Sequence, residues 1–293
     1  MSLIGAIEAG GTKFVLALAR ADGTVLDRTR NETRHPDETF DDMARWFLGA
    51  QDRHGKIGAF GIASFGPIDI DPASPAYGTF TTTPKPGWSG AGFQQALSAF
   101  DVPLAIDTDV NGAALGEVLA GAGQGARTLA YTTVGTGIGT GVVTNGVPLA
   151  GISHYESGHI RPARPAGDEW AGHCPYHGDC LEGLACGPAI KARWGHDLSA
   201  ASPGEIALVA GYLAEFAASL VLLHMPEKLI FGGGVMKAPG VLEGLRVATR
   251  QKLAGYVAQW DRDLTDMIVP PGLGDDAGIT GAIELGRRAL EGE

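Results

Sequence analysis

Cysteine and histidine recur at short spacing in the middle of this chain of 293 residues. Cys174, His177 and Cys180 form the pattern C-x2-H-x2-C, and His159 lies upstream on a segment that can fold back toward them. Two thiolates and two imidazoles are a donor set that suits tetrahedral Zn²⁺. The spacing therefore predicts a closed structural zinc site in which all four ligands are protein side chains.

Other interpretations of this cluster remain open. His154 or His173 could replace His159 as the fourth ligand, because spacing alone does not separate the three histidines. A disulfide within the motif would leave the third cysteine, Cys186, unpaired, and the lack of a signal peptide favours a reducing compartment. A surface loop with chance cysteines is the simplest alternative, but the regular spacing favours a metal.

Two glutamates flank the predicted ligands. Glu156 precedes His159 by three residues, and Glu182 follows Cys180 by two. Closing the metal site would therefore also fix the direction of both carboxylates. Because carboxylates accept hydrogen bonds from hydroxyl groups, we expect these two to bind hydroxyls of a ligand.

Two glycine turns occur in similar surroundings. Ala9-Gly-Gly-Thr-Lys13 and Gly135-Thr-Gly-Ile-Gly139 each lie between two predicted strands. The flanking strands are predicted at 3–8, 14–20, 128–134 and 140–144. Each turn offers backbone N–H groups and a hydroxyl, which can form a concave surface for phosphate oxygens. Either turn alone could be an ordinary hairpin, but two matched copies indicate a duplicated chain that binds phosphate.

Polar residues follow a buried strand predicted at 102–106, just before a helix predicted at 112–120. The sequence between them is Asp107-Thr-Asp-Val-Asn111, and open α/β sheets build their sites at the carboxyl ends of strands. A carboxylate here could accept the proton of a substrate hydroxyl that attacks phosphorus, so Asp107 and Asp109 are candidate general bases. Helix capping is the structural alternative, chiefly for Asp107 and Asn111.

Composition limits the class of protein. With 293 residues, of which 44% are hydrophobic, the chain is large enough for two domains. A formal net charge of −11, without a basic cluster, argues against binding nucleic acid. No apolar run long enough to span a bilayer is evident, and a strand expected from Leu3 leaves no leader. We therefore expect a cytoplasmic globular protein.

The chain resembles the ROK family of sugar kinases over nearly its whole length, because six motifs occur in the family's order. They are Glu8–Lys13, Asp107–Asn111, Gly135–Gly139, Glu156–His159, Cys174–Glu182 and Gly232–Met236. The long loop that ends in TPKPGW, Thr83–Trp88, and the stretch Cys174–Ala185 are most similar to bacterial zinc-containing fructokinases.

The resemblance implies an α/β, actin-like (ribonuclease H-like) fold that is duplicated and two-lobed, with a zinc-binding loop. The N-terminal lobe would comprise residues 1–115, to which 280–293 return. The C-terminal lobe, 116–279, would carry the zinc loop and the adenosine motif. The implied activity is transfer of the γ-phosphoryl group of ATP to D-fructose, with glucokinase, mannokinase or a broader hexokinase as alternatives. ATP, Mg²⁺ and structural Zn²⁺ are the implied cofactors.

The resemblance also assigns roles to matching residues. Asp109 would be the general base, and His159 would bind the sugar with one ring nitrogen and zinc with the other. Sugar hydroxyls would be held by Thr108, Glu156, His159 and Glu182. ATP would be bound by Gly10, Gly11, Thr12, Lys13, Gly135, Thr136, Gly137, Pro188, Gly233, Gly234, Val235, Met236 and Lys237. Zinc would be bound by His159, Cys174, His177 and Cys180.

Three positions depart from the family's usual pattern: Glu8 replaces Asp, Thr108 replaces Asn and Tyr155 replaces Pro. Glu8 could change how the waters of magnesium are held, and Thr108 replaces a side chain expected to hydrogen-bond the sugar. ROK-like repressors carry an N-terminal helix-turn-helix, for which a strand from Leu3 leaves no room. We therefore expect an enzyme whose partners are a small-molecule sugar and a nucleotide, with no nucleic acid and no membrane, assembled as a homodimer.

Overall fold

The computed structural model describes residues 2–83 and 85–292, so Pro84 of the predicted Thr83–Trp88 loop lies outside the described residues. The chain forms two compact units. Unit 1 comprises Met1–Leu119, Pro148–His154 and Asp275–Glu293, and unit 2 comprises Ala120–Val147 and Tyr155–Gly274. Unit 1 is thus built from three separate stretches of the chain.

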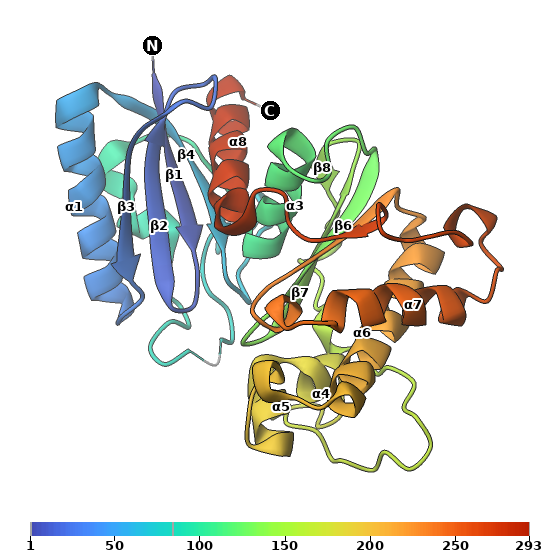
Figure 1. The fold of residues 1–293 in the computed structure, drawn as a ribbon. Helices are drawn as coiled ribbons and strands as arrows, with labels where there is room; N and C mark the ends of the chain where they lie inside the picture. The colour runs from blue at the N-terminus through green and yellow to red at the C-terminus, as the bar shows by residue number, and fades with distance from the viewer. Residues whose placement is uncertain (1, 84, 293) are drawn as a thin grey trace. The chain divides into compact units, whose positions relative to one another are not determined.

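Unit 1 contains a five-stranded sheet in the order β3-β2-β1-β4-β5 (Figure 1). Its strands are β1 (Leu3–Ala9), β2 (Lys13–Ala19), β3 (Val25–Glu32), β4 (Ile57–Ser64) and β5 (Leu104–Thr108). The first three form an antiparallel meander, whereas β4 pairs parallel with β1 and β5 pairs parallel with β4. The carboxyl ends of β1, β4 and β5 therefore lie at the same edge of the sheet.

Unit 2 repeats this topology. Its strands are β6 (Thr128–Val134), β7 (Ile138–Thr144), β8 (Val147–Pro148), β9 (Lys228–Gly232) and β10 (Ile268–Val269), in the order β10-β9-β6-β7-β8. Again a hairpin pairs antiparallel, and β9 and β10 add parallel to its first strand. In each unit the glycine turn joins the first two strands, so the predicted duplication is confirmed.

Both faces of the unit 1 sheet are covered. One face packs against α1 (Pro36–His54) and α2 (Phe93–Ala96) in an aromatic core that includes the fully buried ring of Trp88. The other face presents small residues such as Ala6 and Ala63, which pack against α8 (Ala277–Glu291). Figure 1 shows α1 and α8 on opposite sides of this sheet. The cluster on the α8 face therefore joins residues from the two ends of the sequence.

The helix α3 (Asp109–Ala120) crosses α8 at a distance that only glycine permits. A β-carbon at Gly281 would lie 1.8 Å from the carbonyl oxygen of Gly112, and one at Gly116 would lie 2.2 Å from that of Ala277. The two backbones are thus in direct contact. This contact fixes the helix that begins at Asp109 against the sheet of unit 1.

Unit 2 is organised around α6 (Pro203–His224), which packs against α4 (Leu181–Ala185) and α7 (Val241–Leu253). A capping box starts α6, because Ser202 and Glu205 exchange both hydrogen bonds. The remaining helix of this unit is α5 (Gly187–Trp194). Short 3-10 turns lie at η1 (Ser98–Phe100), η2 (Ser157–His159), η3 (Leu198–Ala200), η4 (Val235–Lys237), η5 (Ala258–Trp260) and η6 (Gly274–Asp276).

The expectation that no apolar segment is long enough to span a bilayer was wrong, because α6 meets that criterion by length and composition. An 18-residue window of α6 has a mean hydropathy of 2.1. However, 56% of that window is buried, and residues such as Val209, Leu213 and Phe216 face neighbouring elements of unit 2. The helix is apolar on most sides because it is a core helix.

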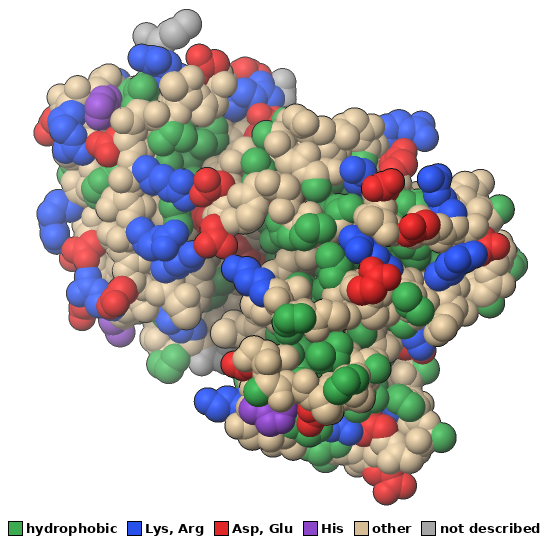
Figure 2. All heavy atoms as spheres, viewed as in Figure 1, with side chains coloured by type: hydrophobic (Ala, Val, Ile, Leu, Met, Phe, Trp, Pro, Cys, Tyr) green, Lys and Arg blue, Asp and Glu red, His purple; other side chains and the backbone are tan. Residues whose placement is uncertain are grey.

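Charged side chains of both signs are interspersed over the face drawn in Figure 2. Several form ion pairs on the surface of unit 1, such as Arg34 with Glu38 and Arg53 with Asp27.

Candidate active site and metal centre

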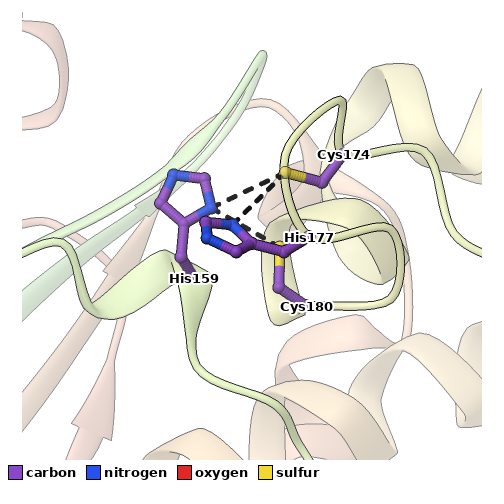
Figure 3. Close-up of side chains that lie close together, drawn as sticks. All are labelled: His159, Cys174, His177 and Cys180. Carbon is purple, nitrogen blue, oxygen red and sulfur yellow. Dashed lines mark hydrogen bonds between the residues drawn. The ribbon is translucent and has the colours of Figure 1, made fainter.

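Four side chains of unit 2 converge in a cluster that could hold a metal ion (Figure 3). The ligand atoms of His159, Cys174, His177 and Cys180 all lie within 4.8 Å of one another. The Nδ1 atom of His159 lies 3.5 Å from Sγ of Cys180 and 3.8 Å from Sγ of Cys174, and Nδ1 of His177 lies 3.7 Å from Sγ of Cys174. Such a set of two sulfurs and two imidazole nitrogens fits tetrahedral Zn²⁺.

The three candidates for the fourth ligand are separated by the fold. His159 is in the cluster, on the turn η2, whereas His173 and His154 do not belong to it. His154 lies in unit 1, where its Nε2 atom accepts a hydrogen bond of 3.3 Å from the backbone N–H of Ile68. The Nδ1 atom of His159 faces the sulfurs, which leaves its Nε2 on the outer edge of the ring.

The three cysteines are free thiols, so the alternative of a disulfide within the motif is not realised. Burial raises the pKa of Cys180 to about 11 and that of Cys186 to about 11. Both would be neutral thiols at pH 7, and a bound cation would be needed to hold Cys180 as a thiolate. Cys186 is buried and does not belong to the cluster.

An ionic network that sequence reasoning missed fastens the loop before the cysteines. The carboxylate of Asp168 is 6% exposed and accepts hydrogen bonds from Arg193 at 2.7 Å and Arg164 at 3.2 Å. Burial raises the pKa of Asp168, but these hydrogen bonds more than offset it, and the net shift is downward. The guanidinium of Arg193 also lies 5.2 Å from the ring of Trp170 and 5.0 Å from that of Trp194.

Glu182 links this loop to the second glycine turn. Its Oε2 atom accepts a hydrogen bond of 2.9 Å from the backbone N–H of Ile138, and a β-carbon at Gly137 would lie 2.6 Å from the same oxygen. Glycine at 137 therefore makes room for the carboxylate. Cys180 caps α4 by accepting a hydrogen bond from the N–H of Gly183, which places Glu182 in the first turn of that helix.

The second glycine turn is also held at its base. The N–H of Gly135 donates to the carbonyl of Gly137 at 2.9 Å, and the N–H of Gly187 donates to the carbonyl of Gly135 at 2.8 Å. Pro188 then lies in the first turn of α5, where its ring is compatible with helix. The predicted ATP-binding residues Gly135, Thr136, Gly137 and Pro188 are thus brought together in unit 2.

The predicted adenosine motif follows β9 in the same unit. Gly233 adopts a φ of +91°, and a β-carbon there would lie 2.3 Å from the carbonyl oxygen of Val134. The chain then passes Gly234 and enters η4, which contains the remaining predicted residues Val235, Met236 and Lys237. This motif therefore starts beside the end of β6, the strand that leads into the second glycine turn.

The first glycine turn, Gly10–Lys13, lies in unit 1. The N–H of Gly10 donates to the carbonyl of Lys13 at 2.9 Å, so this turn too is closed by a backbone hydrogen bond from its first glycine. Thr33 donates its hydroxyl to the carbonyl of Gly10 at 2.7 Å and its N–H to that of Thr12 at 3.0 Å. The sequence of this region did not indicate Thr33, because it lies on the chain that follows β3.

Glu8 lies just before the first turn, at the end of β1. Burial raises its pKa, and Lys13 and Arg28 partly offset that effect. Its Oε2 atom is buried without a hydrogen-bond partner among the described residues. A buried carboxylate oxygen of this kind is a suitable acceptor for a metal-bound water at the phosphate turn.

Asp109 is the first residue of α3, which starts three residues earlier than predicted. The cap of this helix is Thr108, whose Oγ1 accepts a hydrogen bond of 3.2 Å from the N–H of Asn111. Thr108, and not Asp107 or Asn111, therefore caps this helix. Asp109 lies inside the helix, with Oδ1 at 2.9 Å from the N–H of Val110.

The carboxylate of Asp107 is hydrogen-bonded within unit 1. It accepts hydrogen bonds from the side chain of Asn111 at 2.6 Å and from the N–H of Thr108 at 2.7 Å. Burial raises its pKa, and the hydrogen bond from Asn111 is the largest effect that lowers it. The carboxylate of Asp107 is therefore committed to the start of α3, whereas Asp109 is the first residue of that helix.

Comparison with known proteins places the chain in a family. A family model described as the ROK family matches residues 4–289. The chain belongs to the ROK family. It is 44% identical over 298 residues to a putative fructokinase of Bacillus subtilis (strain 168), covering 99% of this chain and 97% of that protein. It is 44% identical over 290 residues to a fructokinase of Zymomonas mobilis subsp. mobilis, covering 97% and 96%.

Solved structures of the ROK family share its architecture. The crystal structure of a ROK hexokinase from Thermus thermophilus matches with a TM-score of 0.81 at 28% identity, covering 99% of this chain and all of that one. Together with the repeated strand order, this match confirms the actin-like, duplicated α/β fold.

The structure shows the surroundings of two residues, Thr108 and Tyr155, that depart from the usual ROK pattern. Thr108 is 5% exposed and uses its hydroxyl oxygen as the cap of α3, a role that an Asn side chain could also fill. Tyr155 is 44% exposed at the start of the unit 2 segment that leads to Glu156 and His159. Glu156 and His159 are joined by the hydrogen bond from the N–H of His159 to the carbonyl of Glu156, at 3.0 Å.

Proposed function

We propose that this chain is an ATP-dependent fructokinase, which transfers the γ-phosphoryl group of ATP to D-fructose to give fructose 6-phosphate and ADP. The observation that carries the proposal is the 44% identity, over nearly the full length of each chain, to two relatives described as fructokinases. The retained C-x2-H-x2-C cluster and both glycine turns support the same activity.

In the proposed reaction Asp109 is the general base. Its carboxylate accepts the proton of the fructose 6-hydroxyl as that oxygen attacks the γ-phosphorus, and the bond from phosphorus to the bridging oxygen of ADP breaks. The position of Asp109 at the carboxyl end of β5, in the first turn of α3, supports this role. The backbone contact of α3 with α8 would keep that carboxylate in a fixed position.

The two glycine turns would bind the phosphates of ATP through backbone N–H groups and the hydroxyls of Thr12 and Thr136. Residues 233–237 would pack against adenosine. When bound, Mg²⁺ would supply positive charge to the phosphate oxygens, with Glu8 holding its waters. The unpartnered Oε2 of Glu8 supports that assignment.

The sugar would be held by Thr108, Glu156, His159 and Glu182. Zn²⁺ bound by His159, Cys174, His177 and Cys180 would supply a fixed scaffold, because a site closed by four protein ligands has no position for a reactive water. His159 would then use Nδ1 for the metal and Nε2 for a sugar hydroxyl, which agrees with the direction of Nδ1 toward the sulfurs.

The proposal also includes a cellular location and an oligomeric state. Free, buried cysteines and ATP as substrate favour a cytoplasmic location. A homodimer is the proposed assembly, and sedimentation of the purified protein measures it.

A coupled assay of ADP release against a panel of hexoses tests the function. We expect fructose to have a higher kcat/KM than glucose, mannose or N-acetylmannosamine, because a site built for one set of hydroxyls leaves polar groups unpaired against another. Omission of magnesium is the control for background hydrolysis. A higher kcat/KM for glucose would contradict the choice of fructose, and no turnover of any hexose would contradict the kinase activity.

A further inference from the structure

The loop that precedes Trp88 brings a lysine to the first glycine turn. The ammonium of Lys85 donates a hydrogen bond of 2.6 Å to the carbonyl oxygen of Gly11. Lys85 is half-buried, whereas Gly11 is exposed and a β-carbon built on it would meet no atom within 4 Å. A positive charge is thus held at the open side of the turn that the proposed function assigns to phosphate.

The position of Lys85 is fixed by a buried anchor three residues further on. Trp88 is fully buried, and its indole N–H donates to the carbonyl of Arg34 at 3.0 Å. Its ring lies 5.4 Å from that of Phe40 and 5.0 Å from that of Phe80. The N–H of Trp88 donates to the carbonyl of Lys85 at 3.2 Å, which ties the lysine backbone to this anchor.

The charge of Lys85 is not neutralised by a protein carboxylate. Within the part of the chain that the structure describes, Lys85 forms no ion pair, and its ammonium donates to a neutral carbonyl oxygen. Lys13, the other lysine of this region, interacts electrostatically with Glu8 and lowers the pKa of that carboxyl against the larger effect of burial. Lys85 therefore supplies net positive charge to the turn, whereas Lys13 offsets a buried acid.

An ammonium has three donor protons, of which the carbonyl of Gly11 takes one. The other two suit the oxygens of a phosphoryl group, for which lysine is a common point-charge ligand. We propose that Lys85 is a phosphate-binding residue that contacts the terminal phosphoryl group of ATP and stabilises its charge during transfer. This inference rests on the proposed kinase function and adds a residue to it.

The substitution Lys85→Met tests the inference, because methionine keeps much of the side-chain length and removes the charge. We expect the variant to bind a non-hydrolysable ATP analogue at least about tenfold more weakly, as the loss of a charged hydrogen bond predicts. Its affinity for ADP should change by less than about twofold, and kcat should fall, with partial rescue in Lys85→Arg. Titration calorimetry in the presence of magnesium measures the affinities.

Lys56→Met is the matched control, since Lys56 is exposed just before the amino end of β4, at the edge of the sheet away from the turn. Equal affinity of wild type and Lys85→Met for the ATP analogue would overturn the inference. So would a rise in the sugar KM alone, which would assign Lys85 to the sugar. If wild type turned over no hexose, the proposed function would fail instead, while the difference between ATP analogue and ADP would still test the contact.

Discussion

The two glycine turns are equivalent in topology but differ in what holds them. In the first turn the carbonyls of Gly10 and Gly11 accept hydrogen bonds from Thr33 and from the ammonium of Lys85. In the second turn a backbone N–H, that of Ile138, donates to the carboxylate of Glu182. A positive side chain thus contacts the first turn and a negative one contacts the second. The two units share their strand order, but the side chains around each turn give it a different electrostatic environment.

The largest effect is expected from Asp109, at the sheet edge of the unit with the positive turn. Asp109→Asn should lower kcat about a hundredfold or more, because the amide cannot accept the sugar proton, while sugar affinity and unfolding temperature stay nearly unchanged. Steady-state kinetics and thermal unfolding on folded, zinc-loaded protein measure both. Asp107→Asn is the matched control and should lower kcat less than Asp109→Asn does. Asp107 is also a buried carboxyl, and burial raises its pKa.

Near-normal turnover by Asp109→Asn would remove the base from this residue. The two units would then still differ in the charge beside their glycine turns, but the catalytic base would no longer be assigned to unit 1.

We expect zinc to stabilise the second glycine turn indirectly, because the ligand Cys180 caps α4 and positions Glu182 against that turn. Purified protein should contain about one zinc per chain, and Cys180→Ser should lower activity about tenfold to a hundredfold by loosening the start of α4. Elemental analysis and activity measure this, with Cys186→Ser as the control, since Cys186 lies outside the cluster. Folded and active protein with less than about a tenth of an equivalent of zinc would contradict the zinc site.

Glu182 itself allows a finer test of the comparison. Glu182→Gln removes the charge but keeps an oxygen that can accept from Ile138, so we expect the fructose KM to rise about tenfold and the ATP KM to stay close to normal. Glu182→Ala removes the acceptor as well and should raise both. Equal ATP KM values in the two variants would show that the bond to Ile138 does not support nucleotide binding.

The smallest effect is expected from Thr33. Thr33→Val removes the donor to Gly10 at nearly constant volume and should lower the free energy of unfolding by about 1 kcal/mol, with about a threefold loss of ATP affinity. Thr33→Ser should restore both, because it keeps the hydroxyl. Chemical denaturation and nucleotide titration measure the change, and an unaltered ATP affinity would leave Thr33 with a purely structural role.

The sequence predicted much of this molecule because its signals are local. Alternating strands, glycine turns and the C-x2-H-x2-C spacing depend on neighbours in the chain, and the duplication and the metal cluster were both predicted from them. The bond from Glu182 to Ile138 joins residues 44 apart, and that from Trp88 to Arg34 joins residues 54 apart. No local pattern encodes such pairs.

The start of α3 was predicted three residues too late. Capping was considered for Asp107 and Asn111, yet Thr108 caps α3 because strand β5 extends two residues further than expected. Boundaries of this kind depend on how far a strand remains paired, and β5 stays paired with β4 as far as Thr108. The sheet, rather than the helix signal, sets the position of Asp109.

The discontinuity of unit 1 has a consequence for synthesis on the ribosome. The small-residue face of its sheet, which includes Ala6 and Ala63, is covered by Ile279 and Ile283 of α8, which follow the whole of unit 2 in the chain. Unit 2 ends at Gly274, so its sequence emerges before this face of the sheet can be covered. We therefore expect a nascent chain to expose this apolar surface until α8 is made, which is the kind of surface that favours aggregation.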